Sequence, residues 1–240
     1  MMVLMQRSLP GGVPPGAMKR LIQGLMRFQR EVFPAKQQLF KSLAESQNPH
    51  SLFITCADSR VVPDLITQSA PGDLFICRNA GNIVPPYGLT NGGVTATIEY
   101  AVVALGIKNI ILCGHSDCGA MRAVLYPERV KDLPTVASWL GHAECARRVV
   151  RENHSNLTDE EALELVTEEN VVAQLDHLRT HPSVAVRLAR GEINLYGWVY
   201  QIHTGQMTAY DVEEGRFLPL NENTMPAATP RPRALRRIVA

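Results

Sequence analysis

Two short segments of the chain carry side chains that bind soft metal ions. Cys56-Ala-Asp-Ser-Arg60 follows the apolar run at residues 51–55, and His115-Ser-Asp-Cys-Gly119 follows a second such run at residues 109–113. Thiolate and imidazole ligands together favour zinc among the common biological metals. Three protein ligands leave a fourth position for water, which is the arrangement of a catalytic zinc rather than a structural one. We therefore expect Cys56, His115 and Cys118 to hold the zinc ion of an enzyme that catalyses hydrolysis or hydration.

Each ligand segment must be positioned by a strand. The runs at 51–55 and 109–113 are short, continuous and apolar, as is a third run at 73–78, and such runs are typical of strands covered on both faces of a parallel sheet. The carboxyl ends of parallel strands share one edge of the sheet, so the two ligand segments meet there. Alternating residues at 194–203 and a shorter run at 207–211 predict a last parallel strand and an antiparallel partner. We expect an α/β fold whose central, mostly parallel sheet has about four parallel strands plus an antiparallel edge strand and is flanked by helices.

Helical patterns account for most of the remaining chain. Apolar residues at helical spacing predict an amphipathic helix at 18–31, and Pro34 suits the first turn of a second helix, so residues 18–48 should form an N-terminal helical arm. The stretch 92–105 is apolar almost all round and should be buried, either in the core or between subunits. Further helices are expected at 134–152, at 159–180 with Thr158 as its cap, and at 183–190 with Gly191 at its end.

The composition excludes several classes of protein. A length of 240 residues suits one domain, expected at 18–220 between an N-terminal extension, 1–17, and a Pro-rich, basic tail, 221–240. A net charge of +1 with interspersed signs gives no footprint for nucleic acid or a membrane surface. No run approaches the roughly 18 apolar residues of a membrane-spanning helix. The odd number of cysteines, five, favours a reducing, cytoplasmic location, with Cys77 and Cys113 buried in strands.

The sequence resembles the β-class carbonic anhydrases, and most of all their plant-type and cyanobacterial branch. The resemblance runs from about Met18 to Asp211. It implies zinc-dependent, reversible hydration of carbon dioxide to bicarbonate and a proton, by attack of zinc-bound hydroxide on the carbon. It also implies one zinc ion per chain and a homodimer or homotetramer. The matching stretches are Cys56-Ala-Asp-Ser-Arg60, Pro71-Gly-Asp-Leu-Phe75, Arg78-Asn-Ala-Gly-Asn82, Glu99-Tyr-Ala101 and Gly114-His-Ser-Asp-Cys-Gly119.

The resemblance implies roles for three polar residues beside the metal. Asp58 accepts a hydrogen bond from the hydroxide when it is paired with Arg60, and in a closed state, favoured at lower pH, it becomes the fourth zinc ligand. A planar guanidinium beside a carboxylate is suited to holding Asp58 off the metal. Gln47 lies nine residues before Cys56 and corresponds to a family residue that reaches the substrate from the neighbouring subunit.

The resemblance also implies a substrate pocket. Phe75, Ala80 and Tyr100 correspond to the apolar wall against which carbon dioxide lies, and Gly119 offers its backbone next to the last zinc ligand. The position of Ala80 holds a larger residue in some plant members, so the resemblance does not determine the width of this pocket.

Other readings of the same residues remain. Carbonyl sulfide and carbon disulfide are linear substrates like carbon dioxide, and their hydrolysis would use the same ligands. A non-catalytic zinc scaffold would need a fourth Cys or His ligand, and a redox thiol protein would need a Cys-x-x-Cys motif. His203 is a candidate proton relay. The remaining histidines of the helical stretches are expected to be solvated; they are His142, His154, His177 and His181.

Overall fold

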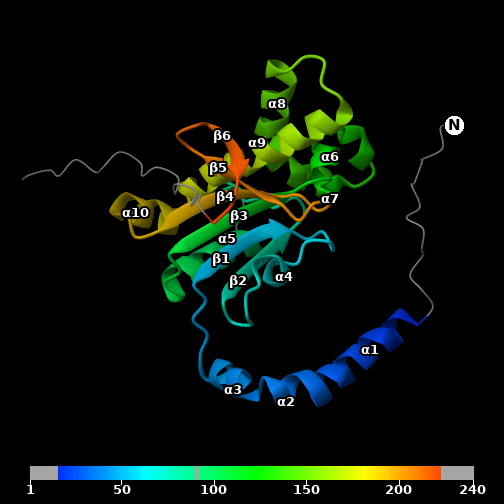
Figure 1. The fold of residues 1–240 in the computed structure, drawn as a ribbon. Coiled ribbons are helices and arrows are strands. Elements are labelled where there is room, and N and C mark those ends of the chain that lie inside the picture. Colours follow the sequence, from blue (N-terminus) through cyan, green and yellow to red (C-terminus); the bar gives the residue numbers. More distant parts are fainter. Residues whose placement is uncertain (1–15, 90–91, 223–240) are drawn as a thin grey trace, which may run out of the picture. The chain divides into compact units, whose positions relative to one another are not determined.

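The computed structural model describes residues 16–89 and 92–222, and Figure 1 shows its fold. The chain divides into two compact units, residues 1–47 and residues 48–240. The predicted extension, except for its last two residues, and most of the predicted tail lie outside the described residues. Among the described helices, none is both long enough and apolar enough to cross a membrane.

The second unit is built on one six-stranded sheet with the order β2-β1-β3-β4-β5-β6 (Figure 1). The first four of these are parallel to one another, and β5 and β6 are each antiparallel to the strand before them, which confirms the predicted α/β class with a mostly parallel sheet. The strands are β1 (Ser51–Cys56), β2 (Leu74–Asn79), β3 (Asn109–His115), β4 (Asn194–Tyr200), β5 (Met207–Asp211) and β6 (Arg216–Pro219).

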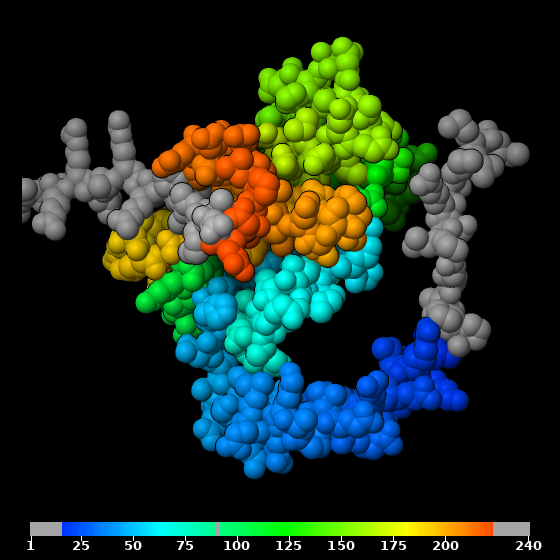
Figure 2. Space-filling model, in the orientation of Figure 1, coloured from blue at the N-terminus to red at the C-terminus, as the bar shows by residue number. Residues whose placement is uncertain are grey.

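One strand was not expected from the sequence. β6 has only four residues and ends on a proline, so it lacks the length and alternation by which strands are recognised. It pairs with β5 across a turn at Gly215, whose φ is +67°, and it makes β5 an interior strand instead of the edge. Figure 2 shows this last hairpin, in orange to red, at the surface.

Strand β3 is two residues longer than predicted. Gly114 and His115 pair with Val199 and Tyr200 of β4, so His115, a predicted zinc ligand, is the last residue of a strand and not part of a loop. Gly114 permits this, because a Cβ there would lie 3.0 Å from Val171 Cγ2 on the covering helix. β4 ends at Tyr200, three residues before its predicted end.

One face of the sheet is covered by three helices around the main apolar core. They are α5 (Gly93–Glu99), α9 (Asp159–Thr180) and α10 (Pro182–Arg190). α9 has the predicted bounds and begins with a capping box, in which Thr158 and Glu161 each accept from the other's backbone N–H. Cys77 and Cys113 are buried, as predicted.

Two predicted helices are interrupted. The stretch 134–152 forms α7 (Pro134–Leu140), a 3₁₀ turn (Gly141–Ala143) and α8 (Glu144–Asn153). The stretch 92–105 forms α5 and then a π-helical turn, Tyr100–Ala104. Tyr100 and Val103 are half exposed, so within one chain this helix is not buried all round. The remaining short elements are α4 (Pro63–Thr67), α6 (Gly119–Leu125) and the 3₁₀ turn Pro127–Val130.

The first unit is helical, and none of its described residues is buried. Its elements are α1 (Ala17–Arg27), a π-helical turn (Phe28–Val32), α2 (Phe33–Ala35) and α3 (Gln37–Glu45). The rings of Phe28, Phe33 and Phe40 contact one another, with centroids 5.4–6.2 Å apart. Leu21 and Leu25 of α1 are more than half exposed, so this unit presents apolar surface that it does not itself cover.

Candidate metal centre

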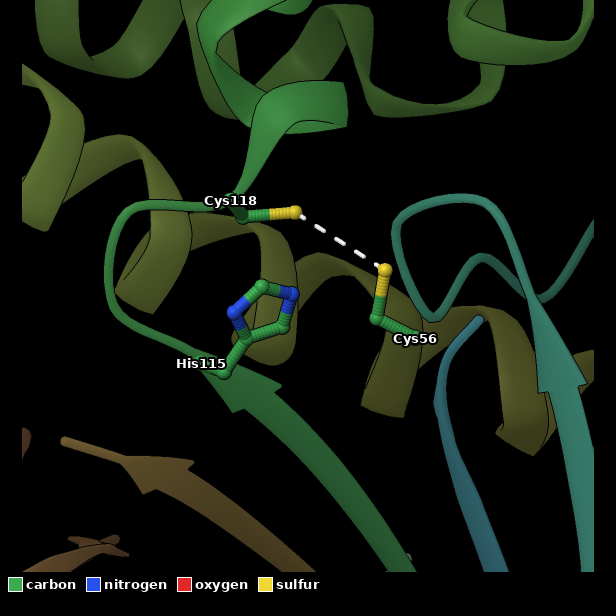
Figure 3. Close-up of side chains that lie close together, drawn as sticks. All are labelled: Cys56, His115 and Cys118. Atoms are coloured by element: carbon green, nitrogen blue, oxygen red, sulfur yellow. Dashed lines mark hydrogen bonds between the residues drawn. The ribbon is translucent and has the colours of Figure 1, made fainter. Parts of the chain in front are cut away.

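The three predicted ligands converge at the carboxyl edge of the sheet (Figure 3). Cys56 ends β1, His115 ends β3, and Cys118 immediately precedes α6. All three are buried, and their ligand atoms lie within 4.8 Å of one another. The sulfur atoms of Cys56 and Cys118 face each other at 4.0 Å. The three side chains that the sequence singled out as ligands thus lie together in a group that could hold a metal ion.

The orientation of His115 suits a metal ligand. Its Nδ1 lies 2.9 Å from the carbonyl oxygen of Ser116, so Nδ1 carries the proton and donates it. Its Nε2 is buried and has no hydrogen-bond partner among the described residues. Such an atom is costly to bury unless something binds it, and a histidine held by one nitrogen and free at the other is the usual arrangement at a metal.

The cysteine pair fits zinc. Two thiolates at the usual Zn–S length of about 2.3 Å in a tetrahedron lie about 3.8 Å apart, close to the separation seen here. The hydrogen bond from Cys118 lowers the pKa of Cys56 to about 4, with help from His115 and the Gly81 backbone. The pKa of Cys118 is raised, because it gives that hydrogen bond and is itself buried. Because the thiolate is the form that binds a metal, a bound cation would displace the thiol proton.

A charged cluster lies on one side of the ligands. Arg60 donates to both carboxylate oxygens of Asp58, from Nε at 3.0 Å and from Nη2 at 2.8 Å. This ion pair holds the pKa of Asp58 well below its usual range. Oδ2 of Asp58 lies 3.9 Å from Nε2 of His115. The carboxylate therefore stands beside the ligand atoms while it is bound to the guanidinium, as the sequence led us to expect of the pair.

Two further residues extend this cluster, and sequence reasoning assigned them no role. Asp117 accepts from Nη1 of Arg60 at 3.1 Å through its side chain and from Nη2 at 3.0 Å through its carbonyl. Arg122 donates to the other carboxylate oxygen of Asp117 at 2.9 Å. Asp117 has a φ of +52°, a conformation that Asp tolerates better than most residues. The sequence feature that could have pointed to Asp117 is its position between two predicted metal ligands, His115 and Cys118.

Arg78 braces the same loop from the neighbouring strand. It donates to the carbonyl oxygens of Cys56, at 3.0 Å, and Asp58, at 2.6 Å. The register explains this contact, because Cys56 of β1 pairs with Asn79 of β2. The backbone that carries both the first ligand and the carboxylate is thus held from β2.

The predicted pocket residues do not all gather at this site. Gly119 follows the last ligand, and Ala80 precedes Gly81, whose N–H donates to Sγ of Cys56 at 3.4 Å. Phe75, however, pairs with Leu52, four residues before the end of β1. At about 3.3 Å per residue this places it roughly 13 Å back along the strand.

Tyr100 packs against Phe75 rather than beside the predicted metal ligands. Their ring centroids are 6.0 Å apart, and half of Tyr100 is exposed. A cavity of about 610 Å³ lies over the π-helical turn and is lined by Tyr87, Tyr100 and Val103. His203 lines a different cavity, of about 390 Å³, together with Ser116 and Arg122. Gln47 is the last residue of the first unit, and its role stays a prediction.

Known proteins resemble this chain over most of its length. Residues 51–207 match the family described as carbonic anhydrase. The carbonic anhydrase of Pseudomonas aeruginosa is 52% identical over 206 residues, which cover 86% of this chain and 93% of the relative. The solved structure of the β-carbonic anhydrase CcaA is 48% identical with a TM-score of 0.84, covering 86% of this chain and 93% of that one. A structure from a study of two tetrameric β-carbonic anhydrases of Sordaria macrospora is 28% identical with a TM-score of 0.74, covering 81% and 96%.

Proposed function

This chain belongs to the β-class carbonic anhydrases, and from that premise we propose how its own side chains carry out the reaction. The reaction is the zinc-dependent, reversible hydration of carbon dioxide to bicarbonate and a proton. Cys56, His115 and Cys118 hold the metal. When bound, zinc supplies a nucleophile at neutral pH by lowering the pKa of water, an effect for which carbonic anhydrase is itself the standard example.

Asp58 orients the nucleophile. Its carboxylate is anionic and held by Arg60, and Oδ2 has a further lone pair on the side of His115. An acceptor at that position takes a hydrogen bond from the nucleophile and leaves its reactive lone pair directed at the carbon. The position of Asp58 beside the buried Nε2 of His115 is the single observation that carries this proposal.

Arg60 keeps the carboxylate away from the metal. A carboxylate that turned from Arg60 toward the ligands would lose two charge-assisted hydrogen bonds. Asp117 in turn accepts from the guanidinium on its other side, so Arg60 stays in the orientation that Asp58 needs. The backbone of Gly119, next to the last ligand, helps to hold the oxygens of the substrate, and Ala80 forms part of the pocket wall beside the ligands.

A second copy of the chain completes the pocket. Phe75 and Tyr100 stand too far from the metal ligands of their own chain, and Tyr100 adjoins an open apolar cavity. We assign these two residues, together with Gln47, to the site of a partner subunit in a homodimer or homotetramer. The tetrameric relatives from Sordaria macrospora support self-association.

We propose the same domain boundaries for each subunit as the sequence predicts. Residues 18–220 form one catalytic domain, and residues 18–48 are its N-terminal helical arm. The free thiols of all five cysteines suit a reducing, cytoplasmic location.

Mixing two inactive variants tests the shared site. Cys118→Ser should remove the metal, and the double variant Phe75→Ala/Tyr100→Ala should keep zinc but hydrate carbon dioxide poorly. Random mixing puts both variants into half of the dimers, and each mixed dimer holds one intact site, so about one quarter of the sites recover. Activity of the co-expressed mixture no higher than the mean of the two variants would contradict the shared site. Zinc analysis of each preparation reports separately on the metal centre.

A further inference from the structure

Two amide side chains on α9 are fully buried although no catalytic role has been given to them. Asn170 and Gln174 have no exposed surface, while most of the inward face of α9 is apolar. Burying an amide is costly unless its donors and acceptors are satisfied. Their hydrogen-bond partners therefore show what these residues hold in place.

Both amides hold the loop that follows β2. Asn170 Nδ2 donates to the carbonyl oxygen of Gly81 at 3.1 Å. Gln174 Oε1 accepts from the backbone N–H of Val84 at 2.8 Å, and its Nε2 donates to Oδ1 of Asn170 at 3.1 Å. The two amides are thus hydrogen-bonded to each other, and each also binds the backbone of the loop, Asn170 at Gly81 and Gln174 at Val84.

The same loop is held from α7 by a tryptophan. Nε1 of Trp139 donates to the carbonyl oxygen of Ala80 at 2.8 Å. This carbonyl and the N–H of Gly81 belong to one planar trans peptide, in which they point in opposite directions. Trp139 therefore sets the direction of the Gly81 N–H, which donates to Sγ of Cys56.

Gly81 is suited to this position by its backbone and its surroundings. Its φ is +81°, which glycine adopts without strain. A Cβ there would lie 3.0 Å from both Ala120 Cβ and Met121 Cε, at the start of α6. Gly81 is thus closely packed between α6 and the metal ligand, and a shift of its peptide would be felt at Cys56.

We infer that Trp139 and Asn170 are positioning residues for the metal ligand Cys56. Trp139 fixes the peptide from the side of Ala80, Asn170 fixes the next carbonyl, and together they aim the Gly81 N–H at Sγ. An N–H···S hydrogen bond withdraws negative charge from a thiolate and holds the sulfur in place, so these residues set how strongly Cys56 donates to the metal. The inference rests on the zinc site of the proposed function.

The test compares Trp139→Phe and Asn170→Leu with the full-length wild-type protein. Phe keeps an aromatic ring at a partly exposed position but removes the N–H, so this variant should fold. Tyr126→Phe is the matched control, because it removes the donor of another aromatic side chain, bound to Asp159, away from the loop. Each protein is loaded with cobalt(II) for absorption spectra and with zinc for release to a chelator.

Loss of the N–H···S bond raises the energy of the sulfur lone pairs. We expect the sulfur-to-cobalt charge-transfer band to move to longer wavelength in both variants. Because the sulfur of Cys56 is then no longer held in place, we also expect zinc to be released roughly 10-fold faster, on the scale of lost interactions around metal ligands. Tyr126→Phe should match the wild type in both measurements. Unchanged spectra and release rates in both variants would overturn the inference while leaving the proposed function intact. A wild-type protein that bound neither metal would overturn the proposed function and the inference together.

Discussion

The two sides of the candidate metal site differ in charge and in burial. On one side Asp58, Arg60 and Asp117 form a charged cluster, in which the side chains of Arg60 and Asp117 are 44% and 62% exposed. On the other side Trp139 and Asn170 hold a neutral loop, and Asn170 is wholly buried. The charged side is partly open to water, and Asn170 on the other side lies in the protein interior.

Mutations on the two sides should therefore have different consequences. Exposed ion pairs contribute little stability, because water and salt screen them and the freed partner is solvated again. A buried hydrogen bond has a modest net value, but removing one partner leaves the other unsatisfied at full cost. The charged side should therefore respond to mutation mainly in turnover, and the buried side mainly in metal retention and stability.

Removing a ligand should abolish the site on which both sides act. Cys118→Ser replaces a thiolate with a poor zinc ligand, so we expect zinc content and carbon dioxide hydration to fall to background. Metal analysis and a hydration assay on the same preparation check this. A Cys118→Ser protein with full zinc and full turnover would remove Cys118 from the ligand set.

Asp58→Asn breaks the charged side at its centre. The amide cannot supply the same anionic acceptor, and we expect turnover at alkaline pH to fall roughly 10²-fold or more, the scale of a positioned catalytic group. Zinc content should stay close to one ion per chain, which separates this variant from a ligand variant. Near wild-type turnover at alkaline pH would exclude Asp58 from the mechanism.

Gly81→Ala breaks the buried side at its contact with the metal ligand. The new Cβ requires a shift of α6 or of the loop, and the left-handed φ of +81° strains alanine but not glycine. We expect zinc release to become roughly 10-fold faster, with a smaller loss in the turnover of the zinc-loaded protein. Gly141→Ala is the matched control, since a Cβ added there would have nothing within 4 Å and the φ of Gly141 is −55°. Equal release rates in the two variants would argue against a special place for Gly81.

Asp117→Asn tests the outer part of the charged side. Arg60 keeps both of its hydrogen bonds to Asp58, so we expect turnover to fall only a few-fold and the free energy of unfolding to change by less than about 0.5 kcal/mol. Turnover at low and high salt, with denaturant unfolding, measures both. A loss as large as that of Asp58→Asn would show that Arg60 depends on Asp117 to hold the carboxylate.

The pKa values of two carboxyl groups, Asp117 and Glu168, are shifted in opposite directions. The charged side lowers the pKa of Asp117, first through Arg122, whereas burial on α9 raises the pKa of Glu168 to about 7. A raised carboxyl pKa means that the folded protein binds a proton that the unfolded chain releases, so stability is lost as pH rises from about 4.5 to 7. We expect Glu168→Gln to be more stable than wild type at pH 8, by about 1 kcal/mol after allowance for partial exposure, and little different at pH 4.5. Denaturant unfolding at both values checks this, and an equal difference at both would contradict it.

The ligands and the sheet were accessible from the sequence because their signals are local. Cys56 and His115 each follow an apolar run, and a run of five or six such residues identifies a strand without knowledge of its neighbours. The bounds of α9 were also local, since Thr158 and Glu161 mark its start. Gly114 and His115 were placed outside their strand because their pairing depends on β4, eighty-five residues later.

The chemistry could be inferred from the residue types alone: the three predicted ligands, the carboxylate and guanidinium beside them, and the strands that carry them. Which polar residues face inward and which pocket residues lie together became known only from the three-dimensional arrangement. His181 was predicted to be solvated, yet it is buried and its Nε2 lies 3.0 Å from the carbonyl oxygen of Pro85, ninety-six residues earlier. Phe75 and Tyr100 were expected beside the metal, yet the strand register places Phe75 at a distance from it, and Tyr100 packs against Phe75. The physical reason is the same in both cases, because burial and proximity depend on contacts between distant parts of the chain, which the local spacing of residue types does not encode.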